Sequence, residues 1–312
     1  MIVTVTPNPS IDRTLRLPVL RRGEVVRASA STSEAGGKGI NVARALDEMG
    51  VPAIAIAPAS DATQAQLEAL LAGHPTVRFV PIDGEIRTNL SLTEPDGTVT
   101  KVNEAGPMLE PTMARRLLED VAAAIATISA VDWVVGCGSL PPGLADTFYA
   151  ELAARLPAGM RVAIDADRGA LRAAIGTRVA LVKPNRIELE ELVEGPLPTL
   201  GDVHDAARGL VAAGVDQVLV SLGLDGALAV DAASACHVEA PIDDVANTVG
   251  AGDALLAGYL AGGANLSALP EAVAWSVAAC RAGGTRMPAV TTRDRAAVLV
   301  HEALDRNRPV RG

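Results

Sequence analysis

The sequence predicts an α/β protein built on a mostly parallel β-sheet that carries helices on both faces. Short β-rich runs alternate along the chain with Ala- and Leu-rich amphipathic runs. The strand candidates are apolar on both faces, as expected for strands buried between two helical layers. In such sheets, ligands bind beyond the carboxyl ends of the strands. The turns that follow the strand candidates are rich in Gly, Asp and Asn, so a functional site is expected there.

The alternation assigns most of the chain to regular elements. The expected strands, in chain order, are Ile2–Thr6, Ala53–Ala57, Val131–Val135, Arg161–Asp165, Ala180–Val182, Gln217–Ser221 and Ala227–Val230. The expected helices are Ile40–Met49, Ala62–Leu71, Pro111–Ile128, Asp146–Arg155, Ile187–Val193, Val203–Ala213, Asp253–Ala261, Leu269–Ala282 and Thr292–Arg306.

Two stretches, Asp12–Ser31 and Glu85–Lys101, break this alternation. Both alternate polar and apolar residues and contain turn signals, Arg22-Gly23 in the first and Pro95-Asp96-Gly97 in the second. They predict strands of a small separate sheet. We therefore expect a single domain with a β lid formed by about residues 12–31 and 85–104. The edge of that lid is a natural surface for a homodimer.

Composition excludes several classes of protein. The chain has 312 residues, of which 49% are apolar and only 2% aromatic, with a net charge of −10. Few aromatics and no basic block argue against binding to nucleic acid or to an anionic membrane. Three widely spaced cysteines fit free thiols in a reducing cytoplasm, and the four histidines show no metal-ligand spacing. No basic segment followed by an apolar signal core precedes the first strand, and no apolar run reaches the roughly 18 residues of a membrane span.

The most informative motif is Asn247-Thr248-Val249-Gly250-Ala251-Gly252-Asp253, which runs directly into an apolar helix. Its glycines allow a tight turn, and a helix that starts there points unpaired N–H groups at a bound anion. A carboxylate beside an anion site makes sense if it removes a proton from the group that attacks a phosphate. The alternative is that Asp253 only caps the helix.

A second glycine-rich loop, Gly36-Gly37-Lys38-Gly39-Ile40-Asn41, also leads into a helix. Bare backbone next to a cation and an amide suits sugar hydroxyls or a phosphate, although a plain helix-entry turn is the alternative. The loop matches neither the P-loop nor the dinucleotide-binding pattern. Lys38 is one of only three lysines in the chain, the others being Lys101 and Lys183.

The remaining motifs follow strands or lie on the lid. An arginine that reaches from a lid, such as Arg87, can clamp a phosphate, although most single arginines are merely solvated. Gly136–Gly143, which contains Ser139, leaves space at the sheet edge or is an ordinary strand exit. Asn185 and Glu188 are three residues apart, so they share a helix face that could hold Mg²⁺ or could form a capping box. The turn Ser221–Gly226 could cradle a nucleotide or could be an ordinary turn between two strands.

Together and in this order, the motifs resemble the ribokinase/phosphofructokinase-B family of sugar kinases over essentially the whole chain. Thr-x-Gly-Ala-Gly-Asp is highly specific for that family. The resemblance implies a Rossmann-like three-layer α/β/α domain (ribokinase-like) with a β lid, often clasped in a dimer, and ATP with Mg²⁺ as cofactor. The matching segments are Thr4–Asp12, Gly36–Asn41, Arg87–Asn89, Gly138–Gly143, Lys183–Glu188, Ser221–Gly226 and Thr248–Asp253.

The resemblance also implies roles by position. Asp253 matches the catalytic base, and Gly250, Ala251 and Gly252 match the anion hole. The positions that match substrate contacts are Asp12, Gly37, Lys38, Asn41, Arg87 and Ser139. Those that match the ATP side are Lys183, Asn185, Ser221, Gly223, Gly226 and Thr248, with Asn185 and Glu188 expected to hold Mg²⁺ through water.

Two positions and one segment depart from the family pattern. Cys137 stands where Ser is frequent, and Ser60 stands where Gly is expected. Asp165-Ala166-Asp167-Arg168-Gly169 replaces the usual Asp-x-Ser-Gly, so no role is assigned to these residues.

Within the family the chain most resembles the 1-phosphofructokinases, through its Thr-Pro-Asn-Pro-x-x-Asp start, Gly-Gly-Lys-Gly-Ile-Asn-Val-Ala and Gly23-Glu24-Val25. The implied reaction is phosphorylation of the 6-hydroxyl of fructose 1-phosphate by ATP. Tagatose-6-phosphate kinases share most of these features, whereas 6-phosphofructokinases of the family tend to carry Gly in place of Lys38. An inactive sugar-phosphate sensor is the non-enzyme alternative; a nucleoside kinase is disfavoured by the scarcity of aromatic residues and by Lys38.

Overall fold

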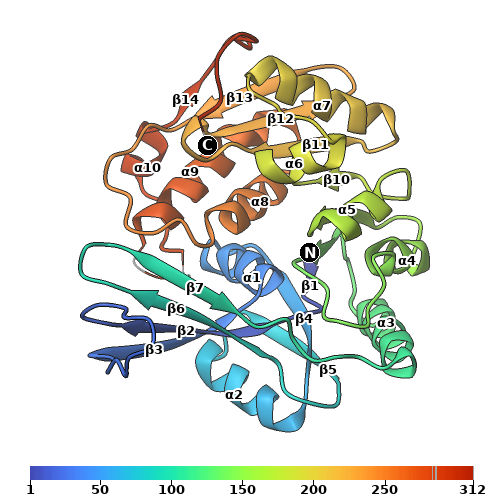
Figure 1. The fold of residues 1–312 in the computed structure, drawn as a ribbon. Coiled ribbons are helices and arrows are strands. Elements are labelled where there is room, and N and C mark those ends of the chain that lie inside the picture. Colours follow the sequence, from blue (N-terminus) through green and yellow to red (C-terminus); the bar gives the residue numbers. More distant parts are fainter. Residues whose placement is uncertain (283, 285–286, 312) are drawn as a thin grey trace.

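The computed structural model describes residues 1–282, 284 and 287–311, and it contains one large and one small β-sheet (Figure 1). The large sheet has ten strands in the order β14-β13-β12-β11-β10-β9-β8-β1-β4-β5. Their bounds are β1 (Ile2–Val5), β4 (Ala53–Ala59), β5 (Thr76–Pro81), β8 (Trp133–Cys137), β9 (Arg161–Asp165), β10 (Leu181–Val182), β11 (Gln217–Ser221), β12 (Ala227–Asp231), β13 (Ala235–Glu239) and β14 (Leu299–Val300).

Neighbouring strands from β5 to β11 are parallel, and β12, β13 and β14 extend the sheet in antiparallel pairs. The mostly parallel sheet expected from the sequence is therefore confirmed. β1 pairs with β4 on one side and with β8 on the other, so the chain reverses its direction of winding at β1. Such a switch point places a crevice beyond the carboxyl ends of the strands.

Helices cover both faces of the large sheet because alternate strand residues point to opposite sides. Val3 and Val134 pack toward one helical layer, and Ile2 and Val135 pack toward the other. The first layer contains α3 (Pro111–Ala126), α4 (Phe148–Arg155), α5 (Arg168–Ala174), α6 (Arg186–Val193) and α7 (Leu200–Ala212). The second contains α1 (Lys38–Glu48), α2 (Asp61–Leu71), α8 (Ala251–Ala261) and α9 (Leu269–Arg281).

The helix expected over Thr292–Arg306 is wrong beyond its first turns. Helix α10 covers only Thr292–Ala296, and the chain then forms strand β14, which pairs antiparallel with β13; just after it, His301 N donates to His237 O at 3.2 Å. A run with helical composition thus becomes an edge strand because β13 offers it an open row of backbone groups. Strands β5 and β13 and helix α5 were not expected from the sequence. Two short 3₁₀ helices, η1 (Gly223–Asp225) and η2 (Leu266–Ala268), complete the assignment.

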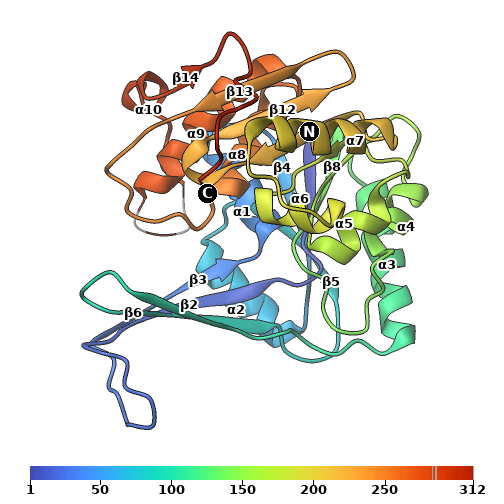
Figure 2. The same cartoon turned by 45° about the horizontal axis from the view of Figure 1, so that its top comes forward.

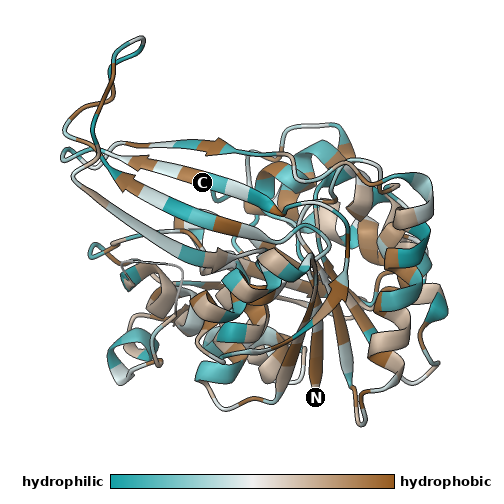
Figure 3. Ribbon diagram, turned by 90° about the horizontal axis from the view of Figure 1, so that it is seen from below, coloured by the Kyte–Doolittle hydropathy of each residue, from teal (hydrophilic) through white to brown (hydrophobic). Residues whose placement is uncertain are grey.

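The small sheet lies apart from the large one and crosses the molecule beside it (Figure 2). It contains β3 (Ala30–Gly36), β2 (Ser10–Arg16), β6 (Arg87–Thr93) and β7 (Val99–Asn103), in that order. β2 and β6 are parallel, and the outer pairs are antiparallel. Figure 3 shows mostly hydrophobic strands in the large sheet and alternating hydropathy in the small one, so the small sheet is apolar on one face only.

The small sheet is tied to the carboxyl edge of the large sheet at two points. β1 leads through the short turn at Thr6–Pro9 into β2, and β3 leads through Gly37 into α1. Residues at the start of β2 and β6 and at the end of β3 are therefore brought to the crevice at β1. Within the described ranges, no helix is long and apolar enough to cross a membrane.

Candidate active site

A cavity of about 330 Å³ lies where the carboxyl edge of the large sheet meets the small sheet and the start of α8. It collects side chains from segments that are far apart in the sequence. The predicted site residues that line it are Asp12, Gly37, Lys38, Asn41, Arg87, Lys183, Asn185, Glu188, Ser221, Gly250, Gly252 and Asp253. Ala251 and Thr248 adjoin lining residues in the chain, and Gly223 and Gly226 lie in the turn that follows Ser221.

Asp253 lies on the first turn of α8, and its side chain is directed into this cavity. The residue is only 8% exposed, and its Oδ2 accepts a hydrogen bond from Asn41 Nδ2 at 2.9 Å. The N-cap of α8 is Gly250, whose φ of 83° is a left-handed conformation that suits glycine. Asp253 is thus not the N-cap residue; a side chain from α1 holds its carboxylate beside the unpaired N–H groups of the helix start.

The surroundings of Asp253 make it a weaker acid than usual. Burial and the nearby Asp165 carboxylate raise its pKa to about 6, against the hydrogen bond from Asn41 and the charges of Lys38 and Lys183. A carboxyl group with this pKa is mostly ionised at neutral pH and still takes up a proton readily. Asp253 therefore has the properties of a general base.

Asp165, at the end of β9, is the central charge of the site, and sequence reasoning assigned it no role. Its side chain is completely buried, with Oδ1 2.8 Å from Lys38 Nζ and Oδ2 3.0 Å from Lys183 Nζ. Although burial opposes its ionisation, the two lysines lower its pKa. Burial likewise disfavours the charge on Lys38, but Asp165 and Glu188 raise its pKa above the usual value. The pairing thus favours the charged forms of Asp165 and Lys38 inside the protein.

A sequence signal for Asp165 was present. It is the last residue of a correctly predicted strand, at the sheet edge where ligands bind. Because the surrounding segment departs from the family pattern, the location of Asp165 at the end of a strand was the one sequence indication of its role.

The capping-box alternative for Asn185 and Glu188 is confirmed. Asn185 Oδ1 accepts from Glu188 N, and Glu188 Oε2 accepts from Asn185 N, both at 2.8 Å. The other carboxylate oxygen of Glu188, Oε1, faces the cavity 4.0 Å from Lys38 Nζ. No group of three or more His, Cys, Asp or Glu suited to a metal occurs among the residues that are described. Because Asn185 Oδ1 is engaged in the cap and Glu188 Oε1 is not, Glu188 is the better ligand of the two for a hydrated cation.

The small sheet contributes a polar wall to the cavity. Asp12 Oδ1 accepts from Ser10 Oγ at 2.7 Å and from Asn89 Nδ2 at 2.9 Å. These contacts fix the Asp12 carboxylate and leave its Oδ2 available to a hydroxyl group. Ser10 and Asn89 line the cavity as well and were not among the predicted site residues.

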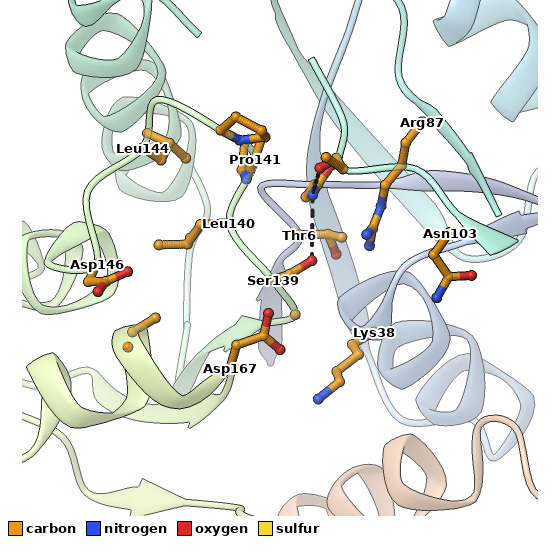
Figure 4. A pocket seen from close by; sticks show the side chains of 16 residues that line it. Thr6, Lys38, Arg87, Asn103, Ser139, Leu140, Pro141, Leu144, Asp146 and Asp167 are labelled. Atoms are coloured by element: carbon orange, nitrogen blue, oxygen red, sulfur yellow. Dashed lines mark hydrogen bonds between the residues drawn. The ribbon is translucent and has the colours of Figure 1, made fainter. Parts of the chain in front are cut away.

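A second cavity, of about 640 Å³, continues from the first past Lys38 and Arg87, which line both (Figure 4). Ser139 lies near the centre of the view, with its Oγ 3.5 Å from Asn8 Nδ2, and Asp167 also lines this cavity. Burial lowers the pKa of Arg87, while Asp12 and Asp167 act in the opposite direction. Arg87 Nε has no hydrogen-bond partner within the described part of the chain. These groups make this passage suitable for an anionic end of a substrate.

Comparison with known proteins places this site in a family. The profile of the pfkB family of carbohydrate kinases matches residues 6–286. The chain belongs to the pfkB family of carbohydrate kinases. The match spans the residues that line both cavities, from Thr6 to Asp253.

The chain is similar to both 1-phosphofructokinases and 6-phosphofructokinases. The chain is 38% identical over 268 residues to a 1-phosphofructokinase of Rhodobacter capsulatus, covering 83% of this chain and 82% of the relative. It is 36% identical over 299 residues to ATP-dependent 6-phosphofructokinase isozyme 2 of Escherichia coli, covering 92% of this chain and 94% of the relative. Phosphofructokinase-2 of Escherichia coli, solved in complex with potassium, has a TM-score of 0.85 at 34% identity and covers 95% of this chain and 96% of its own. The expected fold class is thereby confirmed.

Proposed function

We propose that this pfkB kinase transfers the γ-phosphoryl group of ATP to the 6-hydroxyl of fructose 1-phosphate, giving fructose 1,6-bisphosphate and ADP. The observation that carries the proposal is the Asp253 carboxylate, held by Asn41 at the anion-binding start of α8 with a pKa of about 6. The similarity to the Rhodobacter capsulatus 1-phosphofructokinase supports the choice of substrate.

One group of residues would bind the acceptor. Asp12 and Asn41 would hold sugar hydroxyls, and Arg87, Ser139 and Lys38 would bind the phosphate that the substrate already carries. The continuous passage between the two cavities supports this assignment, since it leads from Asp253 to Arg87 and Ser139. Holding both ends of the sugar phosphate would place its free hydroxyl against Asp253.

In the transfer, the 6-hydroxyl oxygen bonds to the γ-phosphorus as the bond from that phosphorus to the bridging oxygen of ADP breaks. The hydroxyl proton passes to Asp253. The backbone N–H groups of Gly250, Ala251, Gly252 and Asp253 would offset charge on the transferred group. Positioning and these fixed dipoles would supply most of the acceleration.

The nucleotide would occupy the side of the cavity opposite the small sheet. Attacking and leaving oxygens are roughly in line in phosphoryl transfer. Because Asp12 and Arg87 mark the acceptor side, ADP would leave toward Lys183, Asn185 and Ser221, beyond β10 and β11, with Gly223, Gly226 and Thr248 nearby. Glu188 Oε1 would hold Mg²⁺ through water there, and the bound ion neutralises phosphate charge.

A second candidate acceptor is fructose 6-phosphate, since the Escherichia coli 6-phosphofructokinase isozyme 2 matches a larger share of the chain. Tagatose 6-phosphate is the third. Steady-state ATP turnover with the three sugar phosphates and with unphosphorylated fructose tests the proposal. We expect the highest kcat/KM with fructose 1-phosphate and almost none with fructose. A higher kcat/KM with fructose 6-phosphate or tagatose 6-phosphate would make that compound the substrate in place of fructose 1-phosphate. No turnover with any sugar phosphate would favour the alternative of an inactive sugar-phosphate sensor.

The small sheet is also proposed as a homodimer contact. β3 and β7 are its edges, and Val99 and Val102 on β7 are 49% and 52% exposed. Exposed apolar side chains on an edge strand favour association. Sedimentation of the wild-type protein and of Val102→Asp tests it: a wild-type dimer that the variant weakens supports the contact, and a wild-type monomer contradicts it.

A further inference from the structure

The turn Leu222–Gly226 follows β11 on the proposed nucleotide side of the site. Ser221, the residue before it, lines the cavity and pairs with Asn185 in an isolated parallel bridge. The position of this turn therefore sets the position of Ser221 and of the surface beside Asn185. Any element that fixes the turn would influence how ATP binds.

Asp225, within this turn, has a completely buried side chain that is held from outside the turn. Its Oδ2 accepts from Arg311 N at 2.6 Å, and its Oδ1 accepts from Arg311 Nε at 3.0 Å and Nη2 at 2.9 Å. Arg308 Nη2 lies 3.4 Å from the same Oδ1 and also donates to Glu239 on β13. A buried carboxylate with these donors is firmly located, since removing them would leave a buried charge unpaired.

The opposite side of the turn is fixed to the sheet. His237 Nε2 is 2.8 Å from the backbone oxygen of Asp225, in a buried contact. Gly226 has a φ of 81°, and a Cβ there would lie 2.1 Å from Val238 O, so the turn rests directly on β13. The turn is thus held between β13 and the segment Arg306–Arg311.

That segment is itself anchored at the start of α7, a part of the fold that is distant in sequence. Arg308 O accepts from Leu200 N at 2.9 Å, and Val310 N donates to Pro198 O at 2.9 Å. These bonds give Arg308 and Arg311 a fixed base. The contacts on Asp225 are then made by a braced strand-like segment rather than by two independent surface side chains.

We propose that Arg306–Arg311 is a clamp for the nucleotide side of the active site, in which Arg308 and Arg311 are positioning residues that act through Asp225. This inference depends on the proposed use of ATP and does not depend on which sugar phosphate is the acceptor. It orients the turn and Ser221 for the phosphoryl donor and leaves the acceptor side, formed by the small sheet and α1, unaffected.

The test compares Arg308→Ala/Arg311→Ala with the wild-type protein and with Arg306→Ala. Arg306 is a matched control, because it lies on the same segment and pairs with Asp205 at 2.7 Å, away from Asp225. Calorimetry measures the affinity for a non-hydrolysable ATP analogue with Mg²⁺, and kinetics measure KM for ATP and for fructose 1-phosphate. Asp225→Asn, which keeps the shape of the side chain and removes its charge, serves as a second variant.

We expect the double variant to bind the analogue about tenfold more weakly and to raise KM for ATP by a similar factor, the size of one lost charged contact. Asp225→Asn should change both in the same direction. KM for fructose 1-phosphate should stay within about twofold in every variant, and Arg306→Ala should match the wild type. If the two arginines had a merely structural role, KM would rise for ATP and for fructose 1-phosphate together.

Two outcomes overturn the clamp: unchanged affinity for the analogue in the double variant and in Asp225→Asn, or an equal loss for ATP and sugar phosphate. The fate of the proposed function is read separately from the wild type. A wild-type protein that binds the analogue but does not phosphorylate fructose 1-phosphate would refute the acceptor, while the calorimetric comparison would still decide the clamp. A wild-type protein that binds no analogue would refute ATP use and, with it, the clamp.

Discussion

Two buried carboxylates line the candidate active-site cavity, Asp253 at the start of α8 and Asp165 at the end of β9, and their different surroundings give them different pKa values. Asp165 is paired with Lys38 and Lys183, which lower its pKa, whereas Asp253 receives one amide hydrogen bond and has its pKa raised to about 6. The same side chain is therefore held ionised at one position and, at the other, has a raised pKa that suits a proton acceptor. Each carboxylate also depends on the other, because the charge of Asp165 helps to raise the pKa of Asp253.

The largest effect is expected for Asp253→Asn. Loss of a general base typically costs about 10²–10⁴-fold, so kcat should fall by that order while KM for ATP changes little. A variant within a few-fold of wild-type kcat would remove Asp253 from the mechanism. Asp120→Asn, on helix α3 and lining neither cavity, is the control and should keep nearly full activity.

The same variant should be more stable than the wild type at neutral pH. A folded-state pKa of about 6, raised from 3.8, means that the folded protein binds the proton more tightly, so stability falls as pH rises from about 4 to 6. Asp253→Asn avoids that loss and should gain up to about 3 kcal/mol at pH 7. Urea unfolding at pH 7 and pH 4 checks this, and the difference should shrink at pH 4. A less stable variant at pH 7 would show that the carboxylate is not strained by burial.

For Asp165→Asn the expected change in stability has the opposite sign. Lys38 and Lys183 would lose their shared partner, and we expect a loss of about 3 kcal/mol in the free energy of unfolding at pH 7. The loss should diminish at low pH, where the lowered pKa of Asp165 no longer separates the folded from the unfolded state. Asp167→Asn, two residues along and not paired with a lysine, is the matched control. Equal stability of the two variants would contradict the central place of Asp165.

A smaller and more selective effect is expected for Lys38→Ala. Lys38 lines both cavities, so its removal should raise KM for fructose 1-phosphate by about tenfold and KM for ATP by less. Lys101→Ala, on exposed strand β7, should leave both constants unchanged. Initial-rate kinetics with each substrate varied in turn measure the two effects, and equal increases would argue against a role for Lys38 on the acceptor side.

Most of the fold could be predicted because its strands are short, apolar on both faces and separated by amphipathic helices. Prediction failed where tertiary contacts override composition. Residues Leu299–Val300 have helical neighbours in sequence but pair with β13, and the other strands that were not expected, β5 and β13, also lie at or next to an edge of the large sheet. The outer parts of the sheet were thus harder to predict than its centre.

The site was predictable wherever a motif carries its own geometry. The glycines before Asp253 and Lys38 mark helix starts that line the cavity. Asp165 was missed because its role depends on two lysines that are 127 and 18 residues away along the chain, a relation that no local pattern contains. Asp225 was missed for the same reason: its partners Arg308 and Arg311 lie 83 and 86 residues further on.

The most direct test of the account is the pH dependence of kcat, measured with saturating ATP and fructose 1-phosphate for the wild type and for the residual activity of Asp253→Asn. With Asp253 as the base, the wild-type rate should fall about tenfold per pH unit below an apparent pKa near 6, and that acidic limb should be absent from Asp253→Asn. A wild-type rate that stays constant down to pH 5, or the same limb in both proteins, would contradict the assignment of Asp253 as the group that accepts the proton.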